Sequence, residues 1–180
     1  MTGNRRVEYM ALGALKPAKR NPKRHALEPL GASVGRFGFV DPIIIDERTG
    51  RLVAGHGRRD ALIKMRDDGI DPPDGVQRNG KDWVVPVVRG WSSKSDQDAE
   101  AYLVASNKHV ELGGWDDAEL AALLDGLDNL DGVGFDSDEV DKLVAASAPE
   151  PAQDVVPEPP EDAECYVSLG DVWQLGEHRL

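Results

Sequence analysis

Two apolar segments, a turn between them and a histidine flanked by glycines constrain the fold of this chain more than any other feature. Residues 42–46 (PIIID) form a continuous apolar run with the length of a buried strand. The sequence ERTG then favours a tight turn, and residues 52–54 resume as a second strand. GHGR at 55–58 follows at once and opens an amphipathic helix. The pattern predicts a strand, a turn, a strand, a glycine-rich turn and a helix in direct succession.

The rest of the chain adds strands on both sides of this unit and helices mainly after it. Short strands are expected at residues 7–12 and 84–88, and a helix is expected at 26–38. The polar segment 67–82 is expected to be a loop. Three later helices should begin at capping pairs, and the first of them should end near His109. These pairs are Ser95 with Asp98, Asp116 with Glu119, and Asp136 with Glu139.

The net charge of −12 conceals a basic half and an acidic half. Residues 1–95 hold 18 Lys and Arg against 11 Asp and Glu, whereas residues 96–180 hold 3 against 22. The balances are therefore +7 and −19. This distribution permits a polyanionic ligand on the N-terminal half. The alternative is that acidic helices and an acidic tail merely follow a domain of mixed charge.

Simple counts exclude several classes of protein. No apolar run approaches the ~20 residues of a membrane span, and no apolar stretch follows the first arginines as in a secretory signal. The single cysteine, Cys165, excludes an internal disulfide framework and a cysteine-rich zinc site. The histidines lack paired ligand spacing, so no metal site is predicted. We expect a soluble, cytoplasmic protein that makes no membrane contact.

The glycine turn, defined as residues 54–58 (AGHGR), carries the clearest chemistry. Gly55 and Gly57 flank His56, so the backbone can turn sharply and approach a ligand. The amides at the start of the following helix favour an anion. Arg58 can bind phosphate in a bidentate way, and His56 can hydrogen-bond a ligand or exchange a proton near pH 7. The alternative is an ordinary tight turn with a solvated arginine.

Two further segments are candidates for binding anions. The basic loop, defined as residues 16–25, would contact nucleic-acid phosphates through five cations, and its alternative is a solvated turn. These cations are Lys16, Lys19, Arg20, Lys23 and Arg24. Asn107, near the end of the helix that starts at Ser95, would complete a nucleotide or phosphate site. The alternative is that its neighbours Lys108 and His109 only complement the helix dipole.

An acidic, proline-rich stretch precedes the C-terminal end. Residues 148–164 contain five prolines and six acids and no Lys or Arg, which is typical of an extended, solvated linker. Residues 165–180 are apolar and aromatic again and are too few to form a domain. Either this terminal segment folds back onto the body or the chain is cut from something longer.

Several of these segments follow one another in a characteristic order: LKPAKRNPKRH, a helix ending in RFGFVDPIIID, TGRLVAGHGRRDAL and VPVV. This order resembles the ParB/sulfiredoxin superfamily. The subgroup that the chain most resembles is the ParB-like N-terminal domain of phage and plasmid DNA methyltransferases, in which the turn also reads AGHGR. The later segments ASNKHVE, GGWDDAELAALL, GFDSDEVDKL and SLGDVWQLGEHRL match that subgroup as well.

The resemblance implies an α+β fold with a small mixed β-sheet and surrounding helices over residues 1–95. A helical extension would pack on it over 96–147, followed by the linker at 148–164 and the start of a methyltransferase domain at 165–180. The resemblance also implies that a nucleoside triphosphate, CTP or ATP with Mg²⁺, binds at the turn and the Asn-bearing helix. The residues implied are Gly55, His56, Gly57, Arg58 and Asn107.

The resulting hypothesis is a phosphate- or nucleotide- and DNA-binding domain in phage or plasmid DNA modification, acting as a targeting or regulatory module of a DNA methyltransferase. Its expected partners are DNA, a methyltransferase domain or subunit, and a second copy of the chain, in a bacterial or phage-infected cell. Methylation itself is not expected, because the chain stops where the cofactor-binding strands would begin. One alternative is a nucleotide hydrolase, kinase or nuclease with His56 as a catalytic residue. Another is an interaction protein whose acidic tail binds a basic partner.

Overall fold

Strand β5 (Asp82–Trp91) forms the centre of the sheet, because three other strands pair with it. The computed structural model describes residues 3–148, 168–172, 174–175 and 178–179. Strands β1 (Arg6–Ala11) and β4 (Gln77–Asn79) pair with β5 antiparallel. Strand β2 (Ile43–Asp46) pairs with β5 parallel, and β3 (Arg51–Ala54) pairs with β2 antiparallel. The order β1-β5-β2-β3, with β4 beside β5, confirms the expected α+β fold with a small mixed sheet.

The side chains of β5 explain its central place and its tolerance of a proline. Val85 and Val87 are fully buried, and their neighbours Val84, Pro86 and Val88 are partly covered. Pro86 lacks an N–H group, which normally excludes proline from a central strand. In this chain Pro86 lies between two paired segments of β5. Strand β4 pairs with residues 82–84 and strand β2 pairs from Val87 onward, so neither of these strands pairs with Pro86. The expectation that segment 67–82 is entirely loop is wrong, because it contains β4. The sequence did not indicate this strand, since its three residues are polar and exposed and show no apolar alternation.

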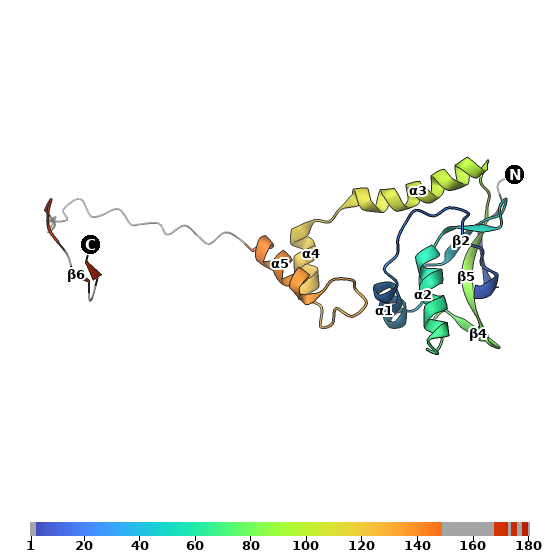
Figure 1. Ribbon diagram of the computed structural model, residues 1–180, viewed down its shortest axis with the longest axis horizontal. Helices are drawn as coiled ribbons and strands as arrows, with labels where there is room; N and C mark the ends of the chain where they lie inside the picture. Colours follow the sequence, from blue (N-terminus) through green and yellow to red (C-terminus); the bar gives the residue numbers. More distant parts are fainter. Residues whose placement is uncertain (1–2, 149–167, 173, 176–177, 180) are drawn as a thin grey trace. The chain divides into compact units, whose positions relative to one another are not determined.

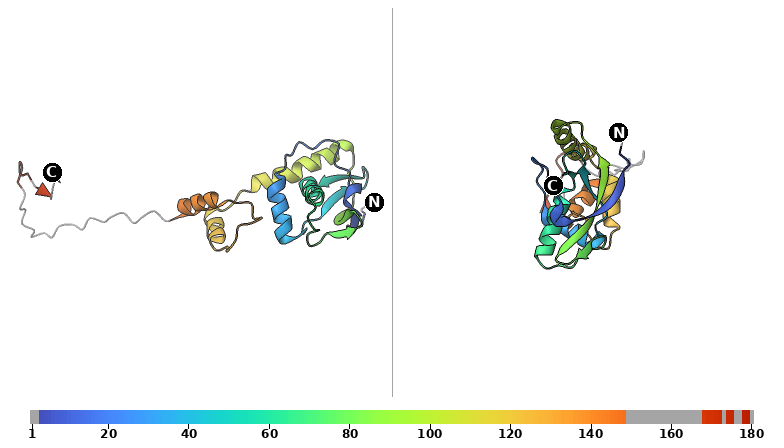
Figure 2. Two further views of the ribbon diagram at one scale, coloured as in Figure 1. Left: turned by 60° about the horizontal axis from the view of Figure 1, so that its bottom comes forward. Right: turned by 90° about the vertical axis from the view of Figure 1, so that its right-hand side faces the viewer.

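Helices α1 (Leu27–Phe37) and α2 (His56–Asp67) lie side by side (Figures 1 and 2). Pro29 stands in the first turn of α1, where a missing N–H breaks no helical bond. A short 3₁₀ helix, η1 (Leu12–Ala14), follows β1. The core is apolar and joins the sheet to both helices. Its fully buried side chains include Leu12, Leu15, Ile43, Leu52, Leu62, Val85 and Val87.

Three helices follow the sheet, and each begins at the expected capping residue. Helices α3 (Asp96–Gly113), α4 (Asp117–Asp125) and α5 (Ser137–Ser147) are capped by Ser95, Asp116 and Asp136. Of the three, α5 has the full capping box, in which the side chain of Glu139 also accepts a hydrogen bond from the N–H of Asp136. Helix α3 continues past His109 to Gly113, because the intervening residues do not interrupt a helix.

Helices α4 and α5 pack against each other and are tied to α1. Their shared core contains Ala121, Leu124 and Val140, all buried. Arg36 of α1 donates from Nη1 to the carbonyl oxygens of Asn129 (2.9 Å) and Asp131 (2.5 Å) in the connection between the two helices. The helical part therefore has a fixed contact with the first half of the chain.

The described residues up to Ala148 belong to one unit, and those from Ser168 onward belong to another. In the second unit, β6 (Gln174–Leu175) pairs antiparallel with β7 (His178–Arg179). The predicted linker at 148–164, apart from its first residue, and much of the predicted terminal segment at 165–180 lie outside the described residues. Among the helices that the structure describes, none has the length and apolar character needed to cross a bilayer.

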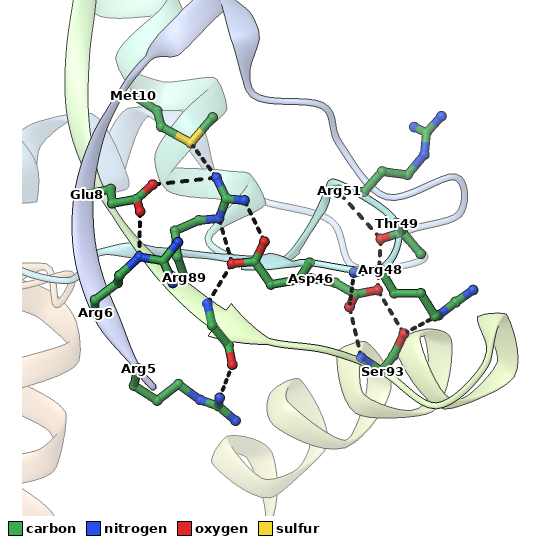
Figure 3. Close-up of polar contacts among 12 residues, drawn as sticks. Arg5, Arg6, Glu8, Met10, Asp46, Arg48, Thr49, Arg51, Arg89 and Ser93 are labelled. Carbon is green, nitrogen blue, oxygen red and sulfur yellow. Dashed lines mark hydrogen bonds and ion pairs between the residues drawn. The ribbon is translucent and has the colours of Figure 1, made fainter. Parts of the chain in front are cut away.

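A polar network attaches the turn between β2 and β3 to the end of β5 (Figure 3). Asp46 is completely buried and accepts hydrogen bonds from Thr49 Oγ1 and from the N–H and Oγ groups of Ser93, each at 2.8 Å. Burial alone would raise the pKa of Asp46, but these hydrogen bonds outweigh it and lower the pKa. The carboxylate of Asp46 therefore stays ionised, and its hydrogen-bond donors satisfy it inside the protein.

Glu47 forms the second half of this network. Arg89 donates from Nε (3.0 Å) and Nη2 (2.5 Å) to its two carboxylate oxygens, and the N–H of Gly90 donates at 2.7 Å. The hydrogen bond from Arg89, followed by that from Gly90, lowers the pKa of Glu47 to about 2.

Replacing Glu47 by Gln should remove a contribution to stability that depends on pH. Because the folded pKa of about 2 lies below the ordinary 4.5, this contribution is complete above pH 4.5 and is lost as the pH falls toward 2. At pH 7 we expect Glu47→Gln to lower the free energy of unfolding by about 1–2 kcal/mol, allowing for screening by solvent. Urea titrations of both proteins from pH 7 to pH 2 test this expectation. A difference that is the same at every pH would contradict it.

Candidate functional site

Gly55 allows β3 to pass directly into α2. It has φ +90° and ψ 18°, a left-handed conformation that residues with side chains rarely adopt. A Cβ atom at this position would lie 2.9 Å from Cγ1 and 3.2 Å from Cα of Ile43 in β2. Glycine therefore brings the start of α2 into contact with the sheet. Glycine has no side chain that could cap a helix, so no side-chain hydrogen bond from this position satisfies the leading amides of α2.

His56 is buried at the first position of α2. Its Nε2 accepts a hydrogen bond from the backbone N–H of Ala18 in the basic loop, at 3.0 Å. A ring nitrogen that accepts carries no proton, so this bond requires the neutral imidazole. Burial, and next the neighbouring His25, lower the pKa of His56, which favours the same state. In this arrangement the candidate catalytic imidazole holds the basic loop at the turn.

The second glycine of the turn makes room for the far end of the basic loop. A Cβ atom at Gly57 would lie 2.8 Å from Nδ1 of His25 and 2.9 Å from Cδ1 of Leu30. The His25 ring, whose Nε2 lies 3.4 Å from Nδ2 of Asn21, is therefore packed directly against the turn. The glycine turn thus has two imidazoles beside it, those of His25 and His56.

Three further hydrogen bonds hold the backbone at the start of the basic loop. All three donors belong to β3 or α2, the two elements joined by the glycine turn, so these bonds hold the loop beside the turn. The bonds run from the N–H of Leu52 to the Lys16 carbonyl (2.9 Å), from Arg51 Nη1 to the Pro17 carbonyl (2.9 Å) and from Arg59 Nε to the Leu15 carbonyl (3.0 Å).

Arg58 reaches the segment before β2. Its Nη1 lies 3.3 Å from Asp41 Oδ2, and its Nη2 donates to the Pro42 carbonyl at 3.3 Å. Nε is buried without a hydrogen-bond partner among the described residues, and burial lowers the pKa of the guanidinium. Arg58 lines a cleft of about 260 Å³ together with Leu30 and Phe37 of α1. The guanidinium of Arg58 therefore borders the cleft and keeps one donor without a partner in the described part of the chain.

Three of the five cations of the basic loop face acids on α3, beneath which the loop runs in Figure 1. The pairs are Lys19 with Asp96 (3.4 Å), Arg20 with Glu100 (3.9 Å) and Lys23 with Glu111 (2.7 Å). In the part of the chain that the structure describes, Lys16 and Arg24 have no ion-pair partner. Sequence reasoning missed these pairs. The available signal was the spacing of four residues between Asp96 and Glu100, which places both acids on one face of a helix.

Asn107 lies on α3 beside the basic loop and apart from Arg58. Its Nδ2 donates to the Leu103 carbonyl one turn earlier, at 2.8 Å. Asn107 lines a cavity of about 180 Å³ with Lys23 and Glu111. The structure therefore brings His56 and Asn107 to the same loop, at different points, whereas Arg58 lines a separate cleft.

Comparisons with known proteins do not identify a family or a function for this chain. No protein-family model and no curated protein matches the chain. Within the described ranges, no three or more His, Cys, Asp or Glu side chains gather as a metal site would require. The feature to be explained is thus a helix start without a side-chain cap and a basic loop that is hydrogen-bonded beside it.

Proposed function

We propose that this chain is a ParB/sulfiredoxin-like domain that binds a phosphate or nucleotide together with DNA. It would serve as a targeting or regulatory module of a DNA methyltransferase in phage or plasmid DNA modification. The observation that carries the proposal is the hydrogen bond from the Ala18 N–H to Nε2 of His56, which fastens the basic loop to the glycine turn. The five cations of the basic loop and the uncapped start of α2 consequently lie in one region of the N-terminal half.

The nucleotide part of the proposal rests on the turn and on Arg58. The leading amides of α2 would donate to a phosphate group. Arg58, the third residue of the same helix, has an Nε group without a partner among the residues that the structure describes, and this group would be one more donor. The expected ligand is CTP or ATP with Mg²⁺, the cation neutralising part of the phosphate charge. Asn107 lines a separate cavity with Lys23 beside the basic loop, so the proposed nucleotide contacts rest on the turn and Arg58 and not on Asn107.

Binding measurements test both ligands. Calorimetry with CTP, ATP and GTP, each with and without duplex DNA, would identify the nucleotide and any coupling between the two ligands. Binding to DNA should weaken steeply as the salt concentration rises, because phosphate contacts release counterions. DNA affinity that does not change with salt, or no detectable affinity, would remove the DNA part of the proposal.

Replacing Arg58 by Ala should weaken nucleotide binding by about tenfold to a hundredfold, the loss of a charge-assisted hydrogen bond. Arg58→Lys should restore little, because an ammonium cannot bind phosphate in a bidentate way. Lys64→Ala provides a control on the same helix, since Lys64 is exposed and pairs with Asp68. Calorimetric titration of the three variants checks the assignment. Wild-type affinity in Arg58→Ala would remove Arg58 from the site.

An enzyme acting at the same turn is the second candidate, and the two imidazoles beside Gly57 favour it. His25 or His56 would transfer a proton during nucleotide hydrolysis, phosphoryl transfer or DNA cleavage. Purified protein would then release phosphate or nick DNA, and His56→Ala would abolish that activity. Unchanged activity in His56→Ala would indicate a contaminant or a different residue.

A further inference from the structure

Helix α3 presents acids along the length of the basic loop. Asp96, Glu100 and Glu111 span four turns of the helix, and each lies within 4 Å of a loop cation. Their positive partners are the side chains that a polyanion would use. Lys23, and next Lys108, lower the pKa of Glu111, so this acid is ionised and paired at neutral pH.

The loop and the helix are joined more by charge than by packing. Open cavities of about 340 Å³ and 180 Å³ lie between them, and both are lined by Pro22 of the loop and Val104 of α3. Leu103 is buried, and the ring centroids of Tyr102 and Trp91 lie 4.7 Å apart in a tilted arrangement, so the middle of α3 is anchored. Beyond it, Val110 is 80% exposed. The contact between Lys23 and Glu111 thus lies where the helix has little apolar support.

We propose that the acidic side of α3 is an internal competitor for the polyanion site of the basic loop. Its carboxylates occupy Lys19, Arg20 and Lys23 in the free protein, and a bound polyanion has to displace them. Lys16 and Arg24, which lack such partners among the described residues, make the first contacts. This inference rests on the proposed function, because it assigns a regulatory role to the same loop. Exposed ion pairs are weak individually, so DNA with many phosphates can replace them.

The acid variant Glu100→Gln with Glu111→Gln tests the competition and leaves Asp96, which also pairs with Arg48 (2.6 Å), in place. We expect it to bind duplex DNA and heparin about fivefold to tenfold more tightly than the wild type at about 0.05 M salt, with the gain shrinking as salt rises. Asp125→Asn with Asp141→Asn removes the same charge from α4 and α5 and should change affinity less than about twofold. Equal gains in both variants would overturn the proposal, because net charge would then explain them.

A double-mutant cycle separates the pairs from the overall charge. Arg20→Gln with Lys23→Gln removes two paired cations, and Lys16→Gln with Arg24→Gln removes two unpaired ones. In the wild-type background, removing the paired cations should reduce DNA affinity less than removing the unpaired cations does. In the acid variant, where the competing carboxylates are gone, the two removals should reduce DNA affinity about equally. Losses that are the same in both backgrounds would contradict the competition.

A measurement without ligand distinguishes failure of this inference from failure of the proposed function. NMR titration of the Glu111 carboxyl group in Lys23→Gln should give a pKa closer to its ordinary value than in the wild type. If that change is seen and no variant binds DNA or heparin, the pairs exist but the proposed function fails, and the competition fails with it. If DNA binds but the pKa of Glu111 does not change, the competition alone is overturned.

Discussion

Gly55→Ala should destabilise the protein by about 2–5 kcal/mol, the sum of a left-handed conformation and an overpacked contact. The alanine would have to hold φ +90° and place its Cβ 2.9 Å from Ile43 Cγ1. The Ile43 Cα atom, 3.2 Å from the same Cβ, belongs to the backbone of β2, which cannot yield without disturbing the sheet. Such a loss is a large part of the stability of an ordinary domain. Thermal and urea unfolding, followed by circular dichroism, measure it.

Two other glycines provide matched controls for this substitution. Gly50 also has a positive φ, +63°, but a Cβ there meets nothing within 4 Å, so Gly50→Ala reports the conformational cost alone. Gly35 lies within α1 and has neither a positive φ nor a close neighbour, so Gly35→Ala should be neutral or stabilising. If Gly55→Ala were no worse than Gly50→Ala, the close approach of the turn to β2 would have no energetic importance.

Neutralising the basic loop should reduce affinity for duplex DNA by about a hundredfold or more at about 0.1 M salt. If each of the five cations contacts one phosphate, the slope of log K against log salt concentration should fall in magnitude by about 4.5. The variant changes Lys16, Lys19, Arg20, Lys23 and Arg24 to Gln. Fluorescence anisotropy with a labelled duplex at several salt concentrations measures both quantities.

The control for the loop variant removes the same charge elsewhere. It changes five exposed cations to Gln: Arg6, Lys64, Arg78, Lys81 and Lys142. Because screening limits the reach of a surface charge to about 10 Å at about 0.1 M salt, this control should keep most of the affinity and the slope. Equal losses in the two variants would show that DNA responds to net charge and not to the basic loop.

The sequence predicted well those elements whose signals are local. The apolar run at 42–46 and the glycines of the turn led directly to β2, β3 and α2, because burial and backbone conformation act on neighbouring residues. Capping residues likewise marked the starts of α3, α4 and α5. Strand β4 was missed because its three exposed residues carry no periodic apolar pattern.

The sequence named candidate residues for a site but did not indicate how they are arranged in space. The sequence placed His56 in a turn, yet only the fold shows its Nε2 accepting from Ala18, 38 residues earlier. It assigned Arg58 and Asn107 to one site, whereas the structure places them in separate cavities. The orientation of a side chain depends on what surrounds it, and those surroundings come from distant parts of the chain.

By itself the sequence determined a strand-turn-strand-helix unit, a glycine turn at the start of its helix, and a basic half followed by an acidic one. The tertiary structure alone decided that these two halves meet, with Lys23 2.7 Å from Glu111 across 88 residues. The physical reason is the range of the forces. Periodicity, capping and glycine conformations act over a few residues, whereas an ion pair forms between whatever charges the completed fold brings within about 4 Å.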